Sequence, residues 1–244
     1  MTRQSSLDTL RKYDLCIRQP EHGYRFSLDA LLLTDFVRMP AEAAVADLGT
    51  GCGVIPIVLA RIHKNARFVA FENNSDIAVL ASENVRVNGL DGRVEIVDDD
   101  IINIRHRFPV SSFDVVVSNP PFRSPRSGKT SPLAGRDVAR HETTAGLADF
   151  LATAKYLVKP GGRICFIYPP SRLAEFIRCA AELKLALLRL RMVHGTVGVG
   201  AKMFLAELAK GRRGDVSVEA PLVVYDETGD YTAEVARMLG VWKA

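Results

Sequence analysis

Residues 44–53 read AVADLGTGCG, an apolar run that leads into three glycines at alternate positions. The run predicts a buried β-strand, and the pattern that follows predicts a helix through about His63. A glycine turn between a strand and a helix lets the backbone bend sharply and approach a ligand closely. In a parallel α/β sheet, ligands bind at this carboxyl end of the strands. The stretch therefore indicates an α/β fold with a ligand site at the turn, although a plain tight connection would use similar glycines.

Short apolar runs and helical patterns continue to alternate after this turn. Strands are expected at 68–72, 94–98, 113–118 and 163–168, and helices at 76–88, 147–158 and 171–183. This alternation is typical of a parallel sheet covered by helices on both faces. After about Leu185 the expected elements are strands at 188–194, 202–210 and 222–226, then a short helix at 232–239. We therefore expect a mostly parallel sheet with antiparallel strands along its C-terminal edge.

The segment before the first core strand is expected to contribute little to the sheet. Residues 3–20 are mixed and polar, which suits a short hairpin or an irregular lead-in. Residues 26–38 predict a helix with Ser27 as its N-cap. The sequence therefore predicts a lead-in and helix over 1–40 and a main domain over 41–244, with one domain overall.

The 244 residues are 48% hydrophobic and 25% charged, a globular balance that excludes a disordered scaffold. Lysine and arginine exceed aspartate and glutamate by 32 to 28, a net charge of +4. Apolar runs fall far short of the ~18 residues that a membrane span needs. The N-terminus also lacks the order of a signal peptide, so we expect a soluble cytoplasmic protein. We expect no disulfide and no metal, because no C-x-x-C pair or zinc-finger spacing involves Cys16, Cys52, Cys165 or Cys179.

Acidic residues follow the second and third core strands. Glu72 stands 19 residues after Gly53, a separation at which an acid can accept hydrogen bonds from the ribose of an adenosine-containing cofactor. It would equally suit a cap for the segment 73–76. The three acids at 98–100 could contact an adenine amino group, and they would also suit a solvated strand end.

The sequence Asn-Pro-Pro-Phe at 119–122 ends the fourth core strand. Methylation of a planar amino group is favoured by two acceptors that hold its N–H groups, and the Asn119 side chain and the Pro120 carbonyl can supply them. The two prolines stiffen the turn that carries these acceptors. Phe122 offers a ring on which a planar base can stack, a contact worth ~1–3 kcal/mol. The motif therefore predicts transfer to an amino nitrogen.

Positive charge concentrates in the segment 123–140. It has five basic residues and one acid, Asp137, so its charge of 5 − 1 = +4 equals that of the whole chain. The basic residues are Arg123, Arg126, Lys129, Arg136 and Arg140. They are candidates for contacts with RNA phosphates, although a solvated linker would have a similar composition.

Taken together, these motifs resemble class I S-adenosylmethionine-dependent methyltransferases that carry an amino-methylating N-P-P-[FY] motif. The chain more closely resembles the family of tRNA1(Val) adenine N6-methyltransferases, over roughly 19–239. The residues that carry the resemblance are 23–33 (GYRFSLDALLL), 47–53, 84–88, 119–122 and 136–142 (RDVARHE). It implies a Rossmann-like class I methyltransferase fold with a seven-stranded, mostly parallel sheet, an antiparallel C-terminal edge and helices on both faces.

The resemblance also implies a role for particular residues. The cofactor contacts would be Phe26, Ser27, Asp47, Gly49, Gly51, Gly53, Glu72, Asn73, Asp99, Asp100 and Asn119. Asp47 and the glycines would hold the methionine part of S-adenosylmethionine, Glu72 the ribose, and Asp99 or Asp100 the adenine. Phe26 and Ser27 would cover the cofactor from the N-terminal side. The catalytic residues would be Asn119, Pro120 and Phe122, acting on a base splayed out of an RNA, most simply a tRNA.

Several alternatives remain open on the sequence. Related adenine enzymes more often have tyrosine in place of Phe122, and the motif also resembles that of ribosomal RNA guanine N2-methyltransferases. Protein glutamine methyltransferases use a similar motif but usually carry an extra N-terminal domain, and only about forty residues precede the first core strand here. A nicotinamide oxidoreductase would need the spacing G-x-G-x-x-G. It would also leave the motif at 119–122 unexplained. The intact motif argues against a module that binds cofactor or RNA without catalysis.

Overall fold

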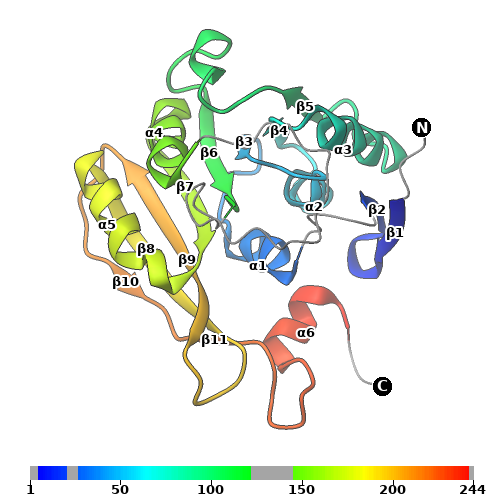
Figure 1. The fold of residues 1–244 in the computed structure, drawn as a ribbon, viewed down its shortest axis with the longest axis vertical. Helices are drawn as coiled ribbons and strands as arrows, with labels where there is room; N and C mark the ends of the chain where they lie inside the picture. Colours follow the sequence, from blue (N-terminus) through cyan, green and yellow to red (C-terminus); the bar gives the residue numbers. More distant parts are fainter. Residues whose placement is uncertain (1–4, 21–26, 122–144, 242–244) are drawn as a thin grey trace, which may run out of the picture.

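The computed structural model describes residues 5–20, 27–121 and 145–241, and its centre is a nine-stranded sheet (Figure 1). In spatial order its main strands are β5 (Val94–Asp98), β4 (Arg67–Glu72), β3 (Ala44–Leu48), β6 (Phe113–Ser118), β7 (Val158–Tyr168), β9 (Ala201–Lys210) and β8 (Leu185–His194). The first five are parallel, and β9 is antiparallel to both of its neighbours. The predicted fold class is therefore confirmed.

The expected count of seven strands is wrong by two. The strands β10 (Ser217–Val218) and β11 (Leu222–Val223) add to the free edge of β8, and both run parallel to it. The strand expected at 222–226 thus ends at Val223 and is not antiparallel to its neighbour. The chain returns along β8 in two short pieces with Pro221 between them, and proline has no N–H to donate to a strand partner.

Helices cover both faces of the sheet (Figure 1). One face carries α1 (Leu28–Phe36), α2 (Val54–Ile62) and α3 (Ser75–Val87), and the other carries α4 (Leu147–Leu157) and α5 (Leu173–Glu182). Successive strand residues point to opposite faces, so Val45 joins the apolar cluster under α1 and α2 while Ala46 and Leu48 join the one under α4. Burial on both faces explains why the strand sequences are nearly continuous apolar runs.

The N-terminal segment forms an antiparallel hairpin, β1 (Ser5–Leu10) with β2 (Leu15–Pro20), outside the main sheet. The 3₁₀ turn Arg11–Tyr13 inside it contacts the C-terminal helix α6 (Ala233–Leu239). Lys12 Nζ donates to the carbonyls of Arg237 and Met238 at 2.8 and 2.9 Å, which satisfies acceptors left free at the end of that helix. The two ends of the described chain are therefore in contact.

No helix in the described ranges is long and apolar enough to cross a bilayer.

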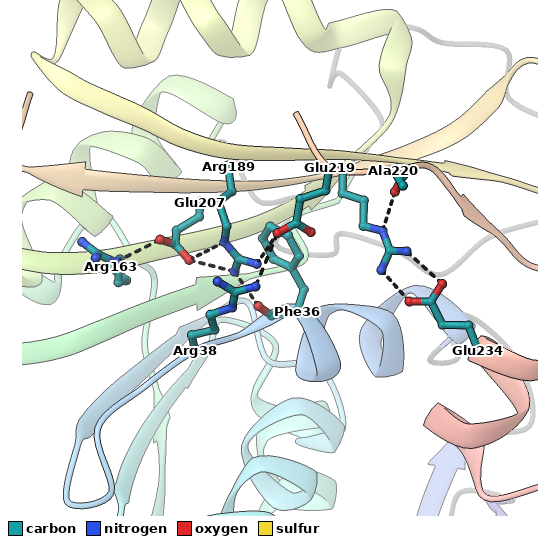
Figure 2. Close-up of polar contacts among 9 residues, drawn as sticks. Phe36, Arg38, Arg163, Arg189, Glu207, Glu219, Ala220 and Glu234 are labelled. Carbon is teal, nitrogen blue, oxygen red and sulfur yellow. Dashed lines mark hydrogen bonds and ion pairs between the residues drawn. The ribbon is translucent and has the colours of Figure 1, made fainter. Parts of the chain in front are cut away.

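A buried ion network ties the C-terminal edge of the sheet to α1, as Figure 2 shows. The Arg189 guanidinium on β8 lies 3.9 Å from the centre of the Phe36 ring and donates to the Phe36 carbonyl at 2.7 Å. It also pairs with Glu207 at 2.8 Å and with Glu219 at 3.0 Å. Arg163 on β7 is a second partner of Glu207, at 2.9 Å. Arg189 is the partner that Glu207 and Glu219 share, and it also donates to the Phe36 carbonyl, so this side chain links α1 to the sheet edge.

Candidate active site

The order of the strands creates a site at their carboxyl ends. From β3 the chain builds β4 and β5 on one side, then returns to place β6 and β7 on the other. The loops after β3 and β6 therefore diverge, and ligands bind at such a switch point. A cavity of about 280 Å³ lies here. Its walls are Pro20, Gly49, Gly51, Cys52, Phe71, Glu72, Asn73, Asn74, Ile77, Asp100, Ile101, Asn119, Pro121 and Phe150.

The glycine turn presents its backbone to this cavity. The N–H groups of Gly49 and Thr50 both donate to the Phe71 carbonyl at 2.9 Å, which fixes the turn against the end of β4. Gly49 has φ +72°, and a Cβ at this position would lie 3.3 Å from the Phe150 ring. The turn therefore needs glycine both for its backbone conformation and for the space beneath Phe150.

Gly49→Ala should lower both stability and cofactor affinity, whereas Gly89→Ala should lower stability alone. Both positions have positive φ, which costs a side chain ~1 kcal/mol. Only at Gly49 would the new methyl group press on a cavity wall, because a Cβ at Gly89 meets nothing within 4 Å. Urea unfolding and equilibrium binding of S-adenosylhomocysteine would measure the two effects. Equal cofactor affinity in the two variants would contradict this account of the turn.

Glu72 ends β4 and organises the turn as well as the cavity. Its Oε2 accepts from the Gly51 N–H at 2.9 Å, and its Oε1 accepts from the Asn74 N–H at 3.0 Å. Burial raises the pKa of Glu72, and these backbone N–H groups act in the opposite direction. Each carboxylate oxygen has more than one acceptor site, so both can still receive hydroxyl groups from a ligand. Glu72 can therefore cap the segment 73–76 and still accept hydrogen bonds from the hydroxyl groups of a ligand, so the two roles expected for it are compatible.

Asp47 lies behind the turn, 1% exposed, at the end of β3. Neither of its carboxylate oxygens has a hydrogen-bond partner among the described residues. Burial raises the pKa of this carboxyl to about 7, the charge of Glu72 adds to the shift, and the nearby Thr50 hydroxyl partly offsets it. An unpaired buried carboxylate is costly, and a cationic ligand beside it would lower that cost. S-adenosylmethionine carries positive charge on its sulfonium and ammonium groups, so the residues present fit this cofactor.

Asn119 follows β6 directly, next to the end of β3. The register pairs Leu48 with Ser118, and the Ser118 hydroxyl donates to the Leu48 carbonyl at 2.7 Å. Asn119 is 9% exposed, lines the cavity, and its Oδ1 has no partner within the described part of the chain. Pro120 is buried, and Pro121 reaches the wall. The turn thus places an unused acceptor beside the space for the cofactor.

The cavity brings together six of the predicted site residues, namely Gly49, Gly51, Glu72, Asn73, Asp100 and Asn119. Asp47 and Gly53 lie outside its wall, as does Pro120. Ser27 is exposed at the start of α1, where its hydroxyl donates to Asp29 at 2.8 Å. The other predicted contacts lie outside the described residues: Phe26, Phe122, Arg123, Arg126, Lys129, Arg136 and Arg140.

The structure separates the two acids that the sequence left as alternatives. Asp99 pairs with Arg107 at 3.2 Å and accepts from the Asn103 side chain at 3.2 Å, so its carboxylate shapes the loop after β5. Asp100 instead lies on the cavity wall beside Ile101. Asp100 is therefore the acid available to a ligand in this cavity.

Sequence reasoning missed several wall residues that come from distant parts of the chain. Phe150 arrives from α4, about a hundred residues after the glycine turn that it covers, and Pro20 comes from the N-terminal hairpin. Ile77 and Ile101 add an apolar slot next to Glu72 and Asp100. The cavity thus offers carboxylates for hydroxyl or amino groups and apolar surface for a planar ring, the combination that an adenosine moiety needs.

Comparisons with known proteins bear on the family to which this chain belongs. The model of the methyltransferase small domain family matches residues 27–172, more than half of the chain. A protein from Porphyromonas gingivalis (strain W83) named tRNA1(Val) (adenine(37)-N6)-methyltransferase is 29% identical over 233 residues, 91% of this chain and 89% of that protein. A protein of the same name from another strain is 31% identical over 199 residues, 79% of this chain and 76% of its own length.

Solved structures show the same fold. A predicted O-methyltransferase from Agrobacterium tumefaciens superposes with a TM-score of 0.71 at 22% identity, covering 87% of this chain and 96% of its own. TrmN from Thermus thermophilus gives a TM-score of 0.55 at 21% identity, over 74% of this chain and 48% of its own. The match to the family model extends from residue 27, just before α1, to residue 172, just after β7, and so includes the turns that follow β3 and β6. The chain therefore belongs to the methyltransferase small domain family and is an S-adenosylmethionine-dependent methyltransferase.

Proposed function

We propose that this enzyme methylates the exocyclic N6 amino group of an adenine in a tRNA, with adenine 37 of tRNA1(Val) as the first substrate to test. The observation that carries the proposal is Asn119, which lines the cavity at the end of β6 and whose buried Oδ1 has no partner among the described residues. The names of the relatives supply the base and the RNA. The tRNA substrate also favours a cytoplasmic enzyme.

The chemistry follows from what the amino group requires. S-adenosylmethionine supplies an electrophilic methyl group. Asn119 Oδ1 and the Pro120 carbonyl accept hydrogen bonds from the two N–H groups of the base. These bonds hold the nitrogen in place and reduce the delocalisation of its lone pair into the ring. Glu72 and the glycine turn orient the cofactor, so the protein contributes proximity and alignment. The nitrogen loses a proton readily once it is methylated and cationic, so no strong base is needed.

The organisation of the chain supports a further part of the proposal. We also propose that the lead-in at 1–40 covers the cofactor site through its hairpin, and that 41–244 is the catalytic domain. Pro20 on the cavity wall supports the covering role, because it places the N-terminal hairpin against the cofactor space. We assign RNA phosphate contacts to the basic segment 123–140, whose charge of +4 suits a polyanion.

Transfer of isotope-labelled methyl groups to separated tRNA, ribosomal RNA and protein fractions tests this function. We expect the label in N6-methyladenosine of the tRNA fraction, after digestion to nucleosides. Label in N2-methylguanosine would support transfer to an amino group but overturn the assignment of adenine as the base. That outcome would agree with Phe at position 122, where related adenine enzymes more often have Tyr. Label in protein would show that the motif at 119–122 serves a glutamine amide.

A further inference from the structure

Two asparagines, Asn84 in α3 and Asn88 directly after its last residue, bind the edge of β2 that faces away from β1. Asn88 donates from Nδ2 to the Cys16 carbonyl at 2.8 Å and accepts the Cys16 N–H on Oδ1 at 2.9 Å. Asn84 does the same for Arg18, donating to its carbonyl at 2.9 Å and accepting its N–H at 2.8 Å. Each carboxamide therefore binds one residue of β2 as a neighbouring strand would.

The spacing of the two asparagines matches that of the strand. Four residues of a helix rise about 6 Å, and two residues of an antiparallel strand rise about 6.8 Å. Alternate residues of a strand point their backbone groups to the same side, so Cys16 and Arg18 present theirs together on the edge away from β1. The pair satisfies an edge that would otherwise remain open.

The two asparagines differ in where their second amide N–H goes. Asn88 donates within its own helix, to the Asn84 carbonyl at 2.7 Å. Asn84 is fully buried and donates at 2.9 Å to the carbonyl of Cys52, in the glycine turn. One carboxamide thus contacts both the hairpin and the turn.

The glycine turn and the hairpin, which Asn84 joins, each form part of the wall of the cofactor cavity. Cys52 lines the cavity from the glycine turn, and Pro20, two residues after Arg18, lines it from the hairpin. Because a buried donor or acceptor that loses its partner is costly, a shift of either wall would break a bond to Asn84. The position of the hairpin and that of the turn are therefore coupled through this side chain.

We propose that Asn84 is a positioning residue for cofactor binding, which locks the hairpin wall and the glycine-turn wall of the cavity into one arrangement. The proposal rests on the cavity being the cofactor site and not on the identity of the methyl acceptor. Asn84 does not touch the cofactor space itself, and it acts through Cys52 and Arg18. Cofactor binding and hairpin docking should therefore strengthen each other.

Asn84→Ala and Asn88→Ala form a matched pair for the test. Each removes two bonds to the backbone of β2, and only Asn84→Ala removes the bond to Cys52. We expect both variants to lose protection of the hairpin amides from hydrogen exchange, and Asn84→Ala to lose more thermal stability, because Asn84 is fully buried and also bonds Cys52. Affinity for S-adenosylhomocysteine should fall at least tenfold in Asn84→Ala and less than threefold in Asn88→Ala.

A measurement on the unaltered protein keeps the test independent of how the variants fold. Saturating S-adenosylhomocysteine should slow hydrogen exchange at the amides of Cys16 and Arg18, which bind α3 and not the ligand. Unchanged exchange there, or equal loss of affinity in the two variants, would overturn the coupling through Asn84. None of these measurements uses RNA, so absent methylation of tRNA adenine would count against the proposed function and leave this inference standing.

Discussion

Asn119→Ala is expected to lower the rate of methyl transfer about 10³-fold while cofactor affinity stays within about threefold of that of the unaltered enzyme. The side chain contributes one acceptor, Oδ1, which is buried and has no partner in the described part of the chain. That acceptor is available to a substrate N–H, and alanine cannot replace it. The glycine turn and Glu72 also line the cavity, and the substitution leaves both in place. Single-turnover methylation of tRNA and equilibrium binding of S-adenosylhomocysteine measure the two quantities separately.

Ser118→Ala is the matched control for this variant. Ser118 is the preceding residue, is also buried, and would lose one hydrogen bond, to the Leu48 carbonyl. Its loss should cost ~1 kcal/mol of stability and leave the transfer rate within a few-fold. Turnover by Asn119→Ala within tenfold of the unaltered enzyme would refute the role assigned to the amide.

Asp47→Asn should weaken binding of S-adenosylmethionine by ten- to a hundredfold and make the ligand-free protein more stable at pH 8. The carboxylate is buried without a hydrogen-bond partner in the described residues, so it is costly in the empty protein and favourable beside a cation. Asparagine has nearly the same shape and no charge. The substitution therefore removes the attraction for the cofactor together with the cost of the buried charge.

The pH dependence of unfolding gives this prediction its sign. The pKa of Asp47 rises from 3.8 to about 7 on folding, so between these values the folded protein binds more protons than the unfolded chain. The contribution of Asp47 to stability is therefore full below about pH 4 and is lost as the pH rises through about 7. The loss amounts to about 4 kcal/mol at most, since each pKa unit corresponds to about 1.4 kcal/mol.

Urea unfolding of both proteins at pH 5 and pH 8 measures the effect. The variant should exceed the unaltered protein in free energy of unfolding by the largest amount at pH 8. The difference should be smaller at pH 5, where the Asp47 carboxyl is protonated in the folded state. A constant difference between the two proteins across this range would show that the carboxyl does not titrate with a raised pKa. Unchanged affinity for S-adenosylmethionine would show that its charge does not serve the cofactor.

Local sequence determined the sheet and the place of the site. The runs at Val94–Asp98 and Phe113–Ser118 became β5 and β6 with the expected bounds. In β6 the run is almost continuously apolar, because a strand inside the sheet is buried on both faces. The glycines after β3, Glu72 after β4 and Asn119 after β6 could be assigned to one edge, since the carboxyl ends of parallel strands meet there. Each of these assignments depends only on residues within one element and its following turn.

Contacts between distant segments decided the rest. Phe150 over Gly49, Pro20 on the cavity wall and the bond from Asn84 to Cys52 join parts of the chain separated by tens of residues, and no local pattern marks them. That Asp100 and not Asp99 lines the cavity depends on which way the loop after β5 turns, and in that loop Asp99 pairs with Arg107. Local propensity places a residue at the end of a strand, and only the packing of the whole chain determines which side chains then face the same cavity.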